Sequence, residues 1–247
     1  MKLYAISDLH LPGGQDKPMD IFGPNWENHP ALIRTNWCAC VQPEDYVLVP
    51  GDISWAMQLD EAAADLEYLG TLPGHKIIVR GNHDYWWHSI GHVRQALPAS
   101  IQAIQNDCLL LPGDVVVCGS RGWDLPESGG TTAPGGPAAQ AAQDRKIYER
   151  ELLRLEMSLR IAQKTGAAHI IAMLHFPPST PEYGRTGFTA LLTEYGVEKC
   201  VYGHLHGNAE RWALRGTYDG VFYQLVAADA LHFTPYFLCN LAEGPAQ

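Results

Sequence analysis

Short apolar runs recur along the chain and are separated by helical or Gly/Pro-rich segments. Each run is rich in residues that favour strands and is apolar at successive positions. Strands buried on both faces, inside a sandwich or under helices, have this pattern. It therefore predicts strands over Leu3–Ser7, Tyr46–Pro50, Lys76–Arg80, Val115–Gly119, Ile170–Leu174, Cys200–Tyr202, Phe222–Ala227 and Tyr236–Cys239.

Helical segments separate several of these runs. The longest extends from about Ala138 to Lys164 and carries one apolar stripe, which predicts that it packs against the sheet. The stripe consists of Tyr148, Leu152, Leu155, Leu159 and Ala162. Shorter helices are predicted over His29–Cys40 with Asn28 as its N-cap, Leu59–Leu69, and His88–Ala96.

The length and composition favour one α/β domain. A chain of 247 residues with 46% hydrophobic content is long enough for one sizeable core. The low-complexity stretch Pro126–Gln140 predicts a flexible loop. The chain on either side of this stretch is too short for two cores of this type. We therefore expect a single domain over residues 1–247 with the loop inside it.

The charge balance argues against nucleic-acid polymers as partners. The formal net charge is −10, and the sequence shows no cluster of Lys and Arg. A general grip on a nucleic-acid backbone needs a basic face. A metal site is a second source of acidity, because bound cations would cancel part of the negative charge of its carboxylates.

The cysteines and the N-terminus point to the cytoplasm. None of the cysteines forms a C-x-x-C pair, and their scattered spacing is unlike a disulfide framework. We expect all of them to be reduced: Cys38, Cys40, Cys108, Cys118, Cys200 and Cys239. The N-terminal apolar run is too short for a signal peptide, and no stretch approaches the roughly 18 apolar residues of a membrane span.

Residues of the types that bind metals follow five of the predicted strands. In open α/β folds, sites form at the C-terminal edge of the strands, where these residues stand. The first, second and fourth motifs alone are ordinary structural signals and the third and fifth are more specific, but it is the five in series that indicate one site. The motifs are Asp8-Leu9-His10, Gly51-Asp52, Gly81-Asn82-His83-Asp84, His175, and Gly203-His204-Leu205-His206.

The residue types suit a site with two metal ions. In an extended segment, residues i and i+2 share a face, so Asp-x-His and His-x-His each present two ligands to one ion. Asp52 has two carboxylate oxygens and is suited to the centre, where it would bridge two cations. Asn82 offers a neutral carbonyl oxygen. Gly51, Gly81 and Gly203 let the backbone turn sharply beside the ions.

Such a pair of cations is sufficient for phosphate-ester hydrolysis. Cations about 3.5–4 Å apart would neutralise the ester, orient it, and produce hydroxide from bound water near neutral pH. This scheme needs no Ser or Cys nucleophile. The mixed imidazole and carboxylate ligands suit Mn, Fe or Zn without ranking them.

The motif series resembles the pattern D-x-H, G-D, G-N-H-[DE], H and G-H-x-H of the calcineurin-like metallophosphoesterase superfamily, over residues 8 to 206. The resemblance implies a four-layered α/β/β/α sandwich of two mixed sheets flanked by helices. It implies that the first metal is bound by Asp8, His10, Asp52 and His206. It implies that the second metal is bound by Asp52, Asn82, His175 and His204.

The resemblance also assigns roles beside the metals. His83 matches the family histidine that contacts the phosphate and protonates the leaving oxygen. Asp84 would orient His83 through a carboxylate–imidazole hydrogen bond. The segment Lys17–Trp26 resembles a bacterial group of predicted phosphohydrolases and carries no information on the substrate.

Departures from the superfamily pattern argue against several kinds of enzyme within the superfamily. The Ser/Thr protein phosphatases have an arginine soon after Gly-Asp and a Glu after Gly-Asn-His, whereas this chain has Ile53-Ser54-Trp55 and Asp84. The lipid-A pathway diphosphatases tend to have arginine at the position of His83. The nucleases of the superfamily share the motifs, but DNA needs a basic groove that the sequence does not show.

Three residues near the predicted site are candidates for substrate binding. Trp55 and Trp86 would stack on a base or sugar, although packing of the segment Tyr85–Ala96 onto the core also accounts for Trp86. Arg121 would hold a phosphate oxygen, with an ion pair to Asp124 as the alternative. The histidines outside the motifs are expected to be structural, and they are His29, His75, His92, His169 and His232.

The sequence therefore predicts a metal-dependent phosphomonoesterase or phosphodiesterase that acts on a small phosphorylated metabolite or nucleotide. His83 as imidazolium would assist the leaving group. A non-catalytic scaffold with the same fold is the alternative from another class, although none of the expected ligand positions is missing. A nuclease is a third alternative, which the acidic composition disfavours.

Overall fold

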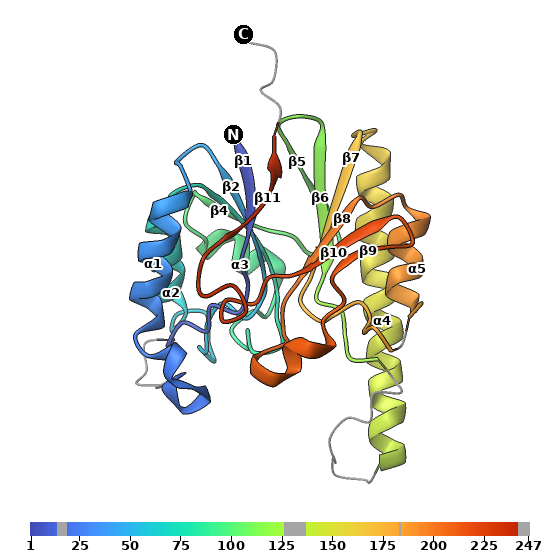
Figure 1. The fold of residues 1–247 in the computed structure, drawn as a ribbon, viewed down its shortest axis with the longest axis horizontal. Coiled ribbons are helices and arrows are strands. Elements are labelled where there is room, and N and C mark those ends of the chain that lie inside the picture. The colour runs from blue at the N-terminus through green and yellow to red at the C-terminus, as the bar shows by residue number, and fades with distance from the viewer. Residues whose placement is uncertain (14–18, 126–136, 183, 242–247) are drawn as a thin grey trace.

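Two β-sheets pack face to face, and helices cover the outer face of each (Figure 1). The computed structural model describes residues 1–13, 19–125, 137–182 and 184–241. The predicted four-layered α/β/β/α sandwich is confirmed. Most of the loop predicted over Pro126–Gln140 lies outside the described residues. Among the described residues, no helix has the length and apolar character needed to span a bilayer.

The first sheet has the strand order β11-β1-β2-β3-β4. All neighbours in it are parallel except β11, which runs antiparallel to β1. Its strands are β1 (Lys2–Ala5), β2 (Tyr46–Pro50), β3 (His75–Val79), β4 (Ile101–Ala103) and β11 (Tyr236–Asn240). The helices on this side are α1 (His29–Cys40), α2 (Ala63–Thr71) and α3 (Ile90–Ala96).

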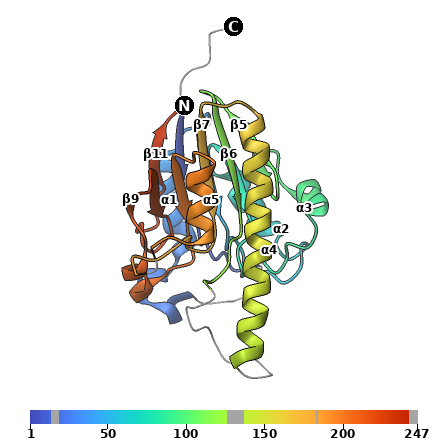
Figure 2. The same ribbon diagram turned by 90° about the vertical axis from the view of Figure 1, so that its right-hand side faces the viewer.

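The second sheet has the order β5-β6-β7-β8-β10-β9 and is parallel in its centre, with an antiparallel strand at each edge. Figure 2 shows α4 and α5 on its outer face. Its strands are β5 (Cys108–Leu111), β6 (Val115–Ser120), β7 (His169–Leu174), β8 (Lys199–Tyr202), β9 (Gly216–Tyr218) and β10 (Val221–Leu225). The helices are α4 (Pro137–Lys164) and α5 (Gly187–Glu194), and short 3-10 turns cover Met19–Phe22, Pro24–Trp26 and Gly207–Trp212.

Alternate residues of each strand enter different cores, because successive side chains of a strand point to opposite faces. Leu48 of β2 and Val117 of β6 meet in the core between the two sheets. Val47 packs with Trp37 of α1 in a second core. Cys118 packs with Leu155 of α4 in a third. The apolar stripe of α4 therefore faces the sheet, as predicted.

Sequence reasoning missed helix α5, which has eight residues, and three strands that are shorter still. Strands β4, β5 and β9 have three or four residues each, too few to show a pattern. Helix α2 begins at Ala63 rather than Leu59, and in the preceding turn the Glu61 carboxylate accepts the main-chain N–H groups of Met57 and Gln58. Asn28 stands at the N-cap position of α1 but has left-handed backbone (φ 51°), and its side chain makes no capping bond.

The C-terminal ends of the central strands of both sheets meet at one edge of the sandwich (Figure 1). The segment after β1 joins the sheets at this edge, because Ser7 N–H donates to the carbonyl of Val226 at 2.8 Å. The Ala228 N–H donates in turn to the Ser7 carbonyl at 3.0 Å. The residues that follow β1 are therefore held between the two layers.

Candidate metal centre

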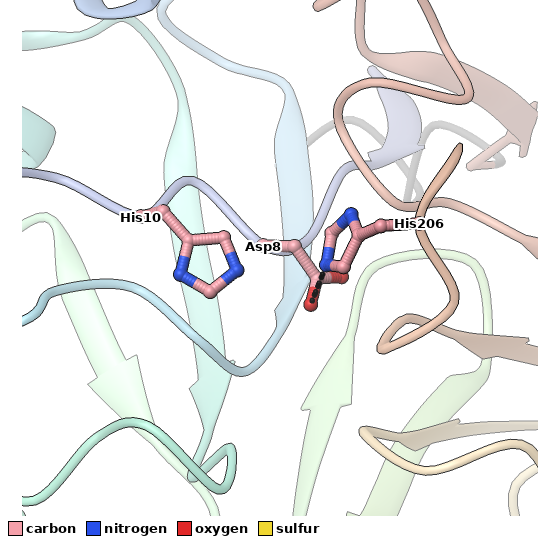
Figure 3. A group of neighbouring side chains, drawn as sticks. All are labelled: Asp8, His10 and His206. Carbon is pink, nitrogen blue, oxygen red and sulfur yellow. Dashed lines mark ion pairs between the residues drawn. The ribbon is translucent and has the colours of Figure 1, made fainter. Parts of the chain in front are cut away.

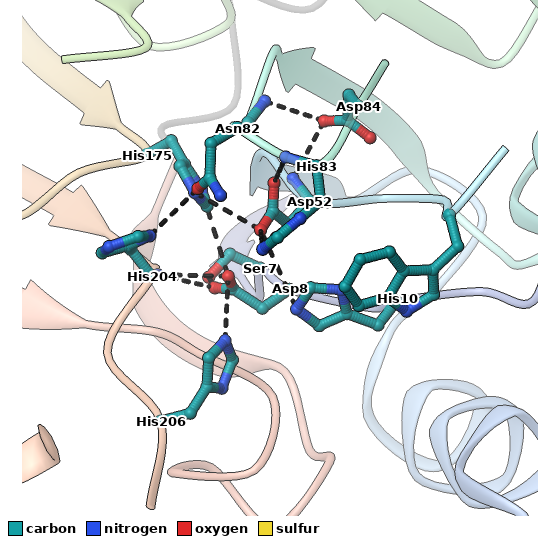
Figure 4. A network of polar contacts seen from close by, with 12 residues as sticks. Ser7, Asp8, His10, Asp52, Asn82, His83, Asp84, His175, His204 and His206 are labelled. Atoms are coloured by element: carbon teal, nitrogen blue, oxygen red, sulfur yellow. Dashed lines mark hydrogen bonds and ion pairs between the residues drawn. The ribbon is translucent and has the colours of Figure 1, made fainter. Parts of the chain in front are cut away.

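The structure brings all the predicted ligand residues together at this edge (Figure 4). The first sheet contributes Asp8 and His10 after β1, Asp52 after β2 and Asn82 after β3. The second sheet contributes His175 after β7, and His204 and His206 after β8. Their proximity is a finding, whereas their role as metal ligands stays a prediction.

One group of potential ligand atoms comes from Asp8, His10 and His206, whose ligand atoms lie within 4.8 Å of one another (Figure 3). Asp8 Oδ1 lies 3.3 Å from His206 Nε2. Two imidazole nitrogens and a carboxylate oxygen at this spacing are suited to a divalent first-row metal ion.

A second group lies beside the first. Asn82 Oδ1 is 2.5 Å from His175 Nε2 and 3.0 Å from His204 Nδ1. The other ring nitrogen of His175, Nδ1, lies 3.1 Å from the carbonyl oxygen of Pro50. When Nδ1 carries the proton and donates it to that carbonyl, the Nε2 lone pair faces the group.

Asp52 lies between the two groups. Its Oδ2 atom is 3.8 Å from His10 Nε2 and 3.5 Å from His175 Nε2. This central position is the one that a bridging carboxylate would need. Asp8 is also close to both groups, since its ligand atoms and those of Asp52 and His175 lie within 4.8 Å of one another.

The backbone that carries the ligands is not extended, so the expected i, i+2 geometry is wrong. Asp8, His10, Asp52 and His204 have positive φ angles of 56°, 43°, 51° and 74°. Left-handed backbone at non-glycine residues is uncommon and costs free energy, so the surrounding structure must hold it. The chain turns at each of these residues, and the ligands converge through turns rather than along a strand face.

Glycines at the site act mainly through close approach. Gly51 does adopt positive φ (89°), as a sharp turn requires. Gly81 and Gly203 do not, but a Cβ on Gly81 would overlap the Asp52 carboxylate, and one on Gly203 would overlap Asp8 Oδ2. The two carboxylates therefore pack directly against glycine backbone.

Burial keeps three of the imidazoles in the neutral form that binds metals. It lowers the pKa of His175 to about 3 and that of His204 to about 4. It also places the pKa of His10 well below its ordinary value. A neutral imidazole offers a lone pair at neutral pH without first losing a proton. His10 Nδ1 is buried and has no hydrogen-bond partner among the described residues.

The buried carboxylates of Asp8 and Asp52 need a nearby positive charge to be stable in their ionised form. Burial, followed by the negative charges of Asp8 and Asp84, raises the pKa of Asp52 well above its ordinary value. Burial also opposes ionisation of Asp8, but the facing His206 outweighs it and holds the pKa of Asp8 below its usual range. A cation in this site would stabilise both carboxylates in their charged form. The donor set and its charge therefore fit metal ions.

The expected hydrogen bond between Asp84 and His83 is wrong. Asp84 is fully buried, and its carboxylate accepts main-chain N–H groups of Asp52, Ile53, Ser54 and Gly81 at 2.7–3.2 Å. It also accepts the indole N–H of Trp86 at 3.0 Å. Asp84 therefore fixes the loop that carries Asp52 and does not orient the His83 ring.

Sequence reasoning missed Asp229. Its Oδ1 lies 2.8 Å from His206 Nδ1, and its Oδ2 accepts the Gly207 N–H at 3.1 Å. Burial opposes the charging of His206, but Asp8 and Asp229 together raise its pKa to about 10. A usable signal was present, because Asp229 closely follows the predicted strand Phe222–Ala227 and thus repeats the strand-end pattern of the other site residues.

The predicted substrate contacts divide into one near the site and two elsewhere. Trp55 lines a cavity of about 390 Å³ beside His10, His83 and His206. Trp86 is fully buried and packs in the core, so it cannot stack on a substrate. The Arg121 side chain lines a different cavity, where it lies 3.5 Å from Glu151 rather than pairing with Asp124.

Comparisons with known proteins agree with this geometry. The sequence profile of the family described as calcineurin-like phosphoesterase matches residues 1–208. A solved protein of unknown function, AQ665 from Aquifex aeolicus, is similar with 15% identity, 95% of this chain and 94% of that chain covered, and a TM-score of 0.51. The phosphopantetheinyl hydrolase PptH from Mycobacterium tuberculosis is similar with 19% identity, 92% and 88% covered, and a TM-score of 0.50. At these identities the likeness shows the fold alone. Among curated proteins, no sequence matches.

Proposed function

Because the chain belongs to the calcineurin-like phosphoesterase family, we propose that it hydrolyses phosphomonoesters or phosphodiesters of a small metabolite or nucleotide with two metal ions. The position of Asp52 between two groups of potential ligands carries this proposal. The first group contains carboxylate and imidazole donors, the second contains imidazoles and the Asn82 amide oxygen, and Asp52 offers a carboxylate to both.

Two sets of protein residues, which share Asp52, would each hold one metal ion. Asp8, His10, Asp52 and His206 would hold one ion, and Asp52, Asn82, His175 and His204 the other. When bound, the two ions would supply charge neutralisation of the phosphate and a lowered pKa of water. Mn, Fe and Zn all suit these donors.

His83 would act on the leaving group. Its main-chain N–H donates to Asp52 Oδ1 at 2.8 Å, which ties its position to the centre of the site. Its ring is about a third exposed, lies 4.0 Å from Asp52 Oδ2, and contacts Trp55 with 4.5 Å between ring centroids. An imidazolium at this position would give its proton to the leaving oxygen.

The size of the neighbouring cavity supports a small substrate. It has a volume of about 390 Å³ and is lined by His83, Trp26, Trp55 and Met19 among others. Volumes of this order accommodate small-molecule ligands. Aromatic walls beside His83 would contact the leaving part of the substrate, and Trp55 would make this contact.

A direct assay tests the proposal. The purified chain is analysed for bound metal and assayed with p-nitrophenyl phosphate and bis(p-nitrophenyl) phosphate, with and without added Mn. We expect metal-dependent release of p-nitrophenolate, and loss of both activity and metal in Asp52→Asn. A folded, metal-loaded protein with no activity on these esters or on a panel of phosphorylated metabolites would instead support the non-catalytic scaffold.

A further inference from the structure

A second cavity, of about 170 Å³, lies at the same edge of the sandwich beside β3, β6 and α4. It shares no lining residue with the cavity at the metal centre. Four arginines, Arg80, Arg121, Arg150 and Arg154, line it together with Glu151. We call it the arginine pocket. The sequence shows no basic cluster because these residues are brought together only by the fold.

The arginine pocket carries excess positive charge. Glu151 is the one acidic residue among its lining residues, and its side chain is 1% exposed. Its Oε1 atom lies 2.9 Å from Arg154, 3.2 Å from Arg150 and 3.5 Å from Arg121. A single carboxylate balances one of four guanidinium groups. This surplus occurs in a chain whose net charge is −10, so the overall composition does not account for it.

Two of the guanidinium groups have unused donors. The Nε atoms of Arg80 and Arg121 are buried and have no hydrogen-bond partner among the described residues. A buried donor without a partner costs free energy, and such groups in native proteins call for an explanation. Burial lowers the pKa of Arg121 to about 10, which leaves the group charged at neutral pH.

The Arg121 side chain is also held in place. Its guanidinium stacks over the Trp123 ring with 4.6 Å to the ring centroid. Its main-chain oxygen accepts the N–H groups of His175 and Phe176 at 3.0 and 2.9 Å. A guanidinium whose orientation is fixed before binding loses little freedom when it binds an oxyanion.

A purely structural network explains only part of this arrangement. The contacts with Glu151 would hold α4 against the end of β6, and three of the arginines take part in them. Arg80 makes no ion pair among the described contacts, and its buried Nε has no hydrogen-bond partner there. Positive charge and N–H donors without partners therefore remain after the ion pairs with Glu151 are taken into account.

We propose that the arginine pocket binds an oxyanion, a phosphate or carboxylate group, separately from the metal centre. Guanidinium groups bind such anions through paired N–H donors. The volume of the pocket is several times the roughly 30 Å³ that a water molecule occupies in the liquid, so a phosphate group fits. Arg80 precedes the Gly81–Asn82 turn, and the Arg121 carbonyl binds the His175 N–H, so the pocket adjoins the metal-ligand loops.

Binding of inorganic phosphate to the full-length, metal-loaded protein tests this proposal. We expect two classes of site by equilibrium dialysis, one at the metals and one in the arginine pocket. Asp52→Asn should lose the first and keep the second. Arg150→Gln combined with Arg154→Gln should weaken the second by about tenfold or more. Arg160→Gln, which removes an exposed arginine of the same helix, is the matched control and should keep both.

The proposal is overturned if the double variant binds phosphate at both sites as the parent does, or if Asp52→Asn binds none. A thermal melt verifies that the double variant folds, since it removes two partners of buried Glu151. If it does not fold, crystals of the parent grown with tungstate replace it, with an anomalous peak expected between Arg80 and Arg154. Absence of that peak counts against the proposal. None of these readouts needs hydrolysis, so they stand apart from the proposed function.

The source of the oxyanion is then distinguished by kinetics. The ratio of kcat/KM for a nucleoside 3′,5′-bisphosphate to that for a nucleoside 5′-monophosphate is measured in the parent and the double variant. A tenfold fall in the ratio identifies the anion as a second acidic group of the substrate. An unchanged ratio, with phosphate binding lost, identifies a free anion that binds independently. Both results support the site.

Discussion

Asp229 lies 2.8 Å from Nδ1 of His206, while Nε2 of the same ring faces Asp8 at 3.3 Å. A carboxylate that accepts the Nδ1 proton fixes the tautomer and the ring orientation, so that Nε2 points its lone pair at the metal site. Asp229 therefore acts on the first group of ligands through His206.

Replacement of Asp229 by Asn should weaken metal binding without unfolding the protein. Loss of such an outer partner typically costs about 10–100-fold in metal affinity. Titration against a competing chelator measures this change. Asp219→Asn, at an exposed turn with positive φ that Asn tolerates, is the control and should bind metal as the parent does. Equal affinities in the two variants would show that Asp229 does not position His206.

His83→Ala should lower kcat and leave the metals in place, because the His83 ring stands beside the predicted ligands rather than among them. A missing general acid typically costs about 10²–10⁴-fold. The loss should be largest for alkyl phosphates, whose leaving group needs a proton, and smaller for p-nitrophenyl phosphate. Full activity of the variant on an alkyl phosphate would contradict the acid role.

Gly81→Ala should disrupt the site, because its Cβ would lie 2.8 Å from Cγ of Asp52 and closer still to the carboxylate oxygen. The loop must shift to admit it, so we expect loss of metal and a fall in activity of about 100-fold or more, since small displacements at a reacting centre have effects of this size. Gly91→Ala is the control. No atom lies within 4 Å of the added Cβ there, and helix α3 should gain about 0.5–1 kcal/mol. Metal analysis and thermal melts measure both.

Trp86→Phe should affect activity as well as stability. It removes the indole N–H that donates to buried Asp84 at 3.0 Å, and this carboxylate in turn fixes the Asp52 loop. We expect a loss of about 1–3 kcal/mol in the free energy of unfolding together with weaker metal binding. Trp87→Phe also removes an indole hydrogen bond, to Gln105 at 3.0 Å, but that bond does not reach the site. Metal binding should therefore stay normal in the Trp87 variant.

Stability at alkaline pH should depend on Lys76. This side chain is fully buried, its Nζ donates to the carbonyls of Leu72 and Gly74, and burial lowers its pKa to about 8. The unfolded chain keeps the proton to about pH 10.5. Between these values the unfolded state binds more protons, so the contribution of Lys76 to stability rises with pH. Below about pH 8 the folded state carries the full cost of the buried charge.

The measurement for Lys76 is a comparison of two denaturation series from pH 7 to 10. The free energy of unfolding of the parent minus that of Lys76→Met should increase with pH. The difference cancels the titration of cysteines and tyrosines, which both proteins share. Lys164→Met, at the exposed end of α4, is the control and should show no such trend. A flat difference for Lys76→Met would mean that the folded and unfolded chains titrate this lysine alike.

Most strands and the convergence of the ligand residues could be predicted from the sequence, because buried strands and strand-end motifs are local patterns, whereas the four layers were implied by the resemblance to the metallophosphoesterase superfamily. Asp84 shows the limit of this reasoning. The motif correctly placed Asp84 at the site. The hydrogen-bond partners of Asp84, however, are main-chain groups of Asp52, Ile53 and Ser54, which lie far from it in the chain. The left-handed backbone at Asp8 and His10 could not be predicted either, because positive φ at Asp and His has no clear sequence signal.

The predictions of Trp86 and Arg121 as substrate contacts failed for a related reason. Trp86 lies two residues after a metal motif, but the chain turns after Asp84 and directs this indole into the core beneath α2 and α3. The direction of a side chain in a loop depends on tertiary packing rather than on spacing. The arginine pocket depends in the same way on residues from β3, β6 and α4, which only the folded chain assembles.

The division of the ligands between the two sheets makes the site sensitive to how the layers sit against each other. Asp52 and Asn82 follow strands of one sheet, and His175 and His204 follow strands of the other. Ions bound between them would cross-link the halves of the sandwich, so a chelator should loosen the packing between the sheets. Substitutions in the intervening core, such as at Leu48 or Val117, would then alter catalysis from a distance by letting one sheet slide over the other.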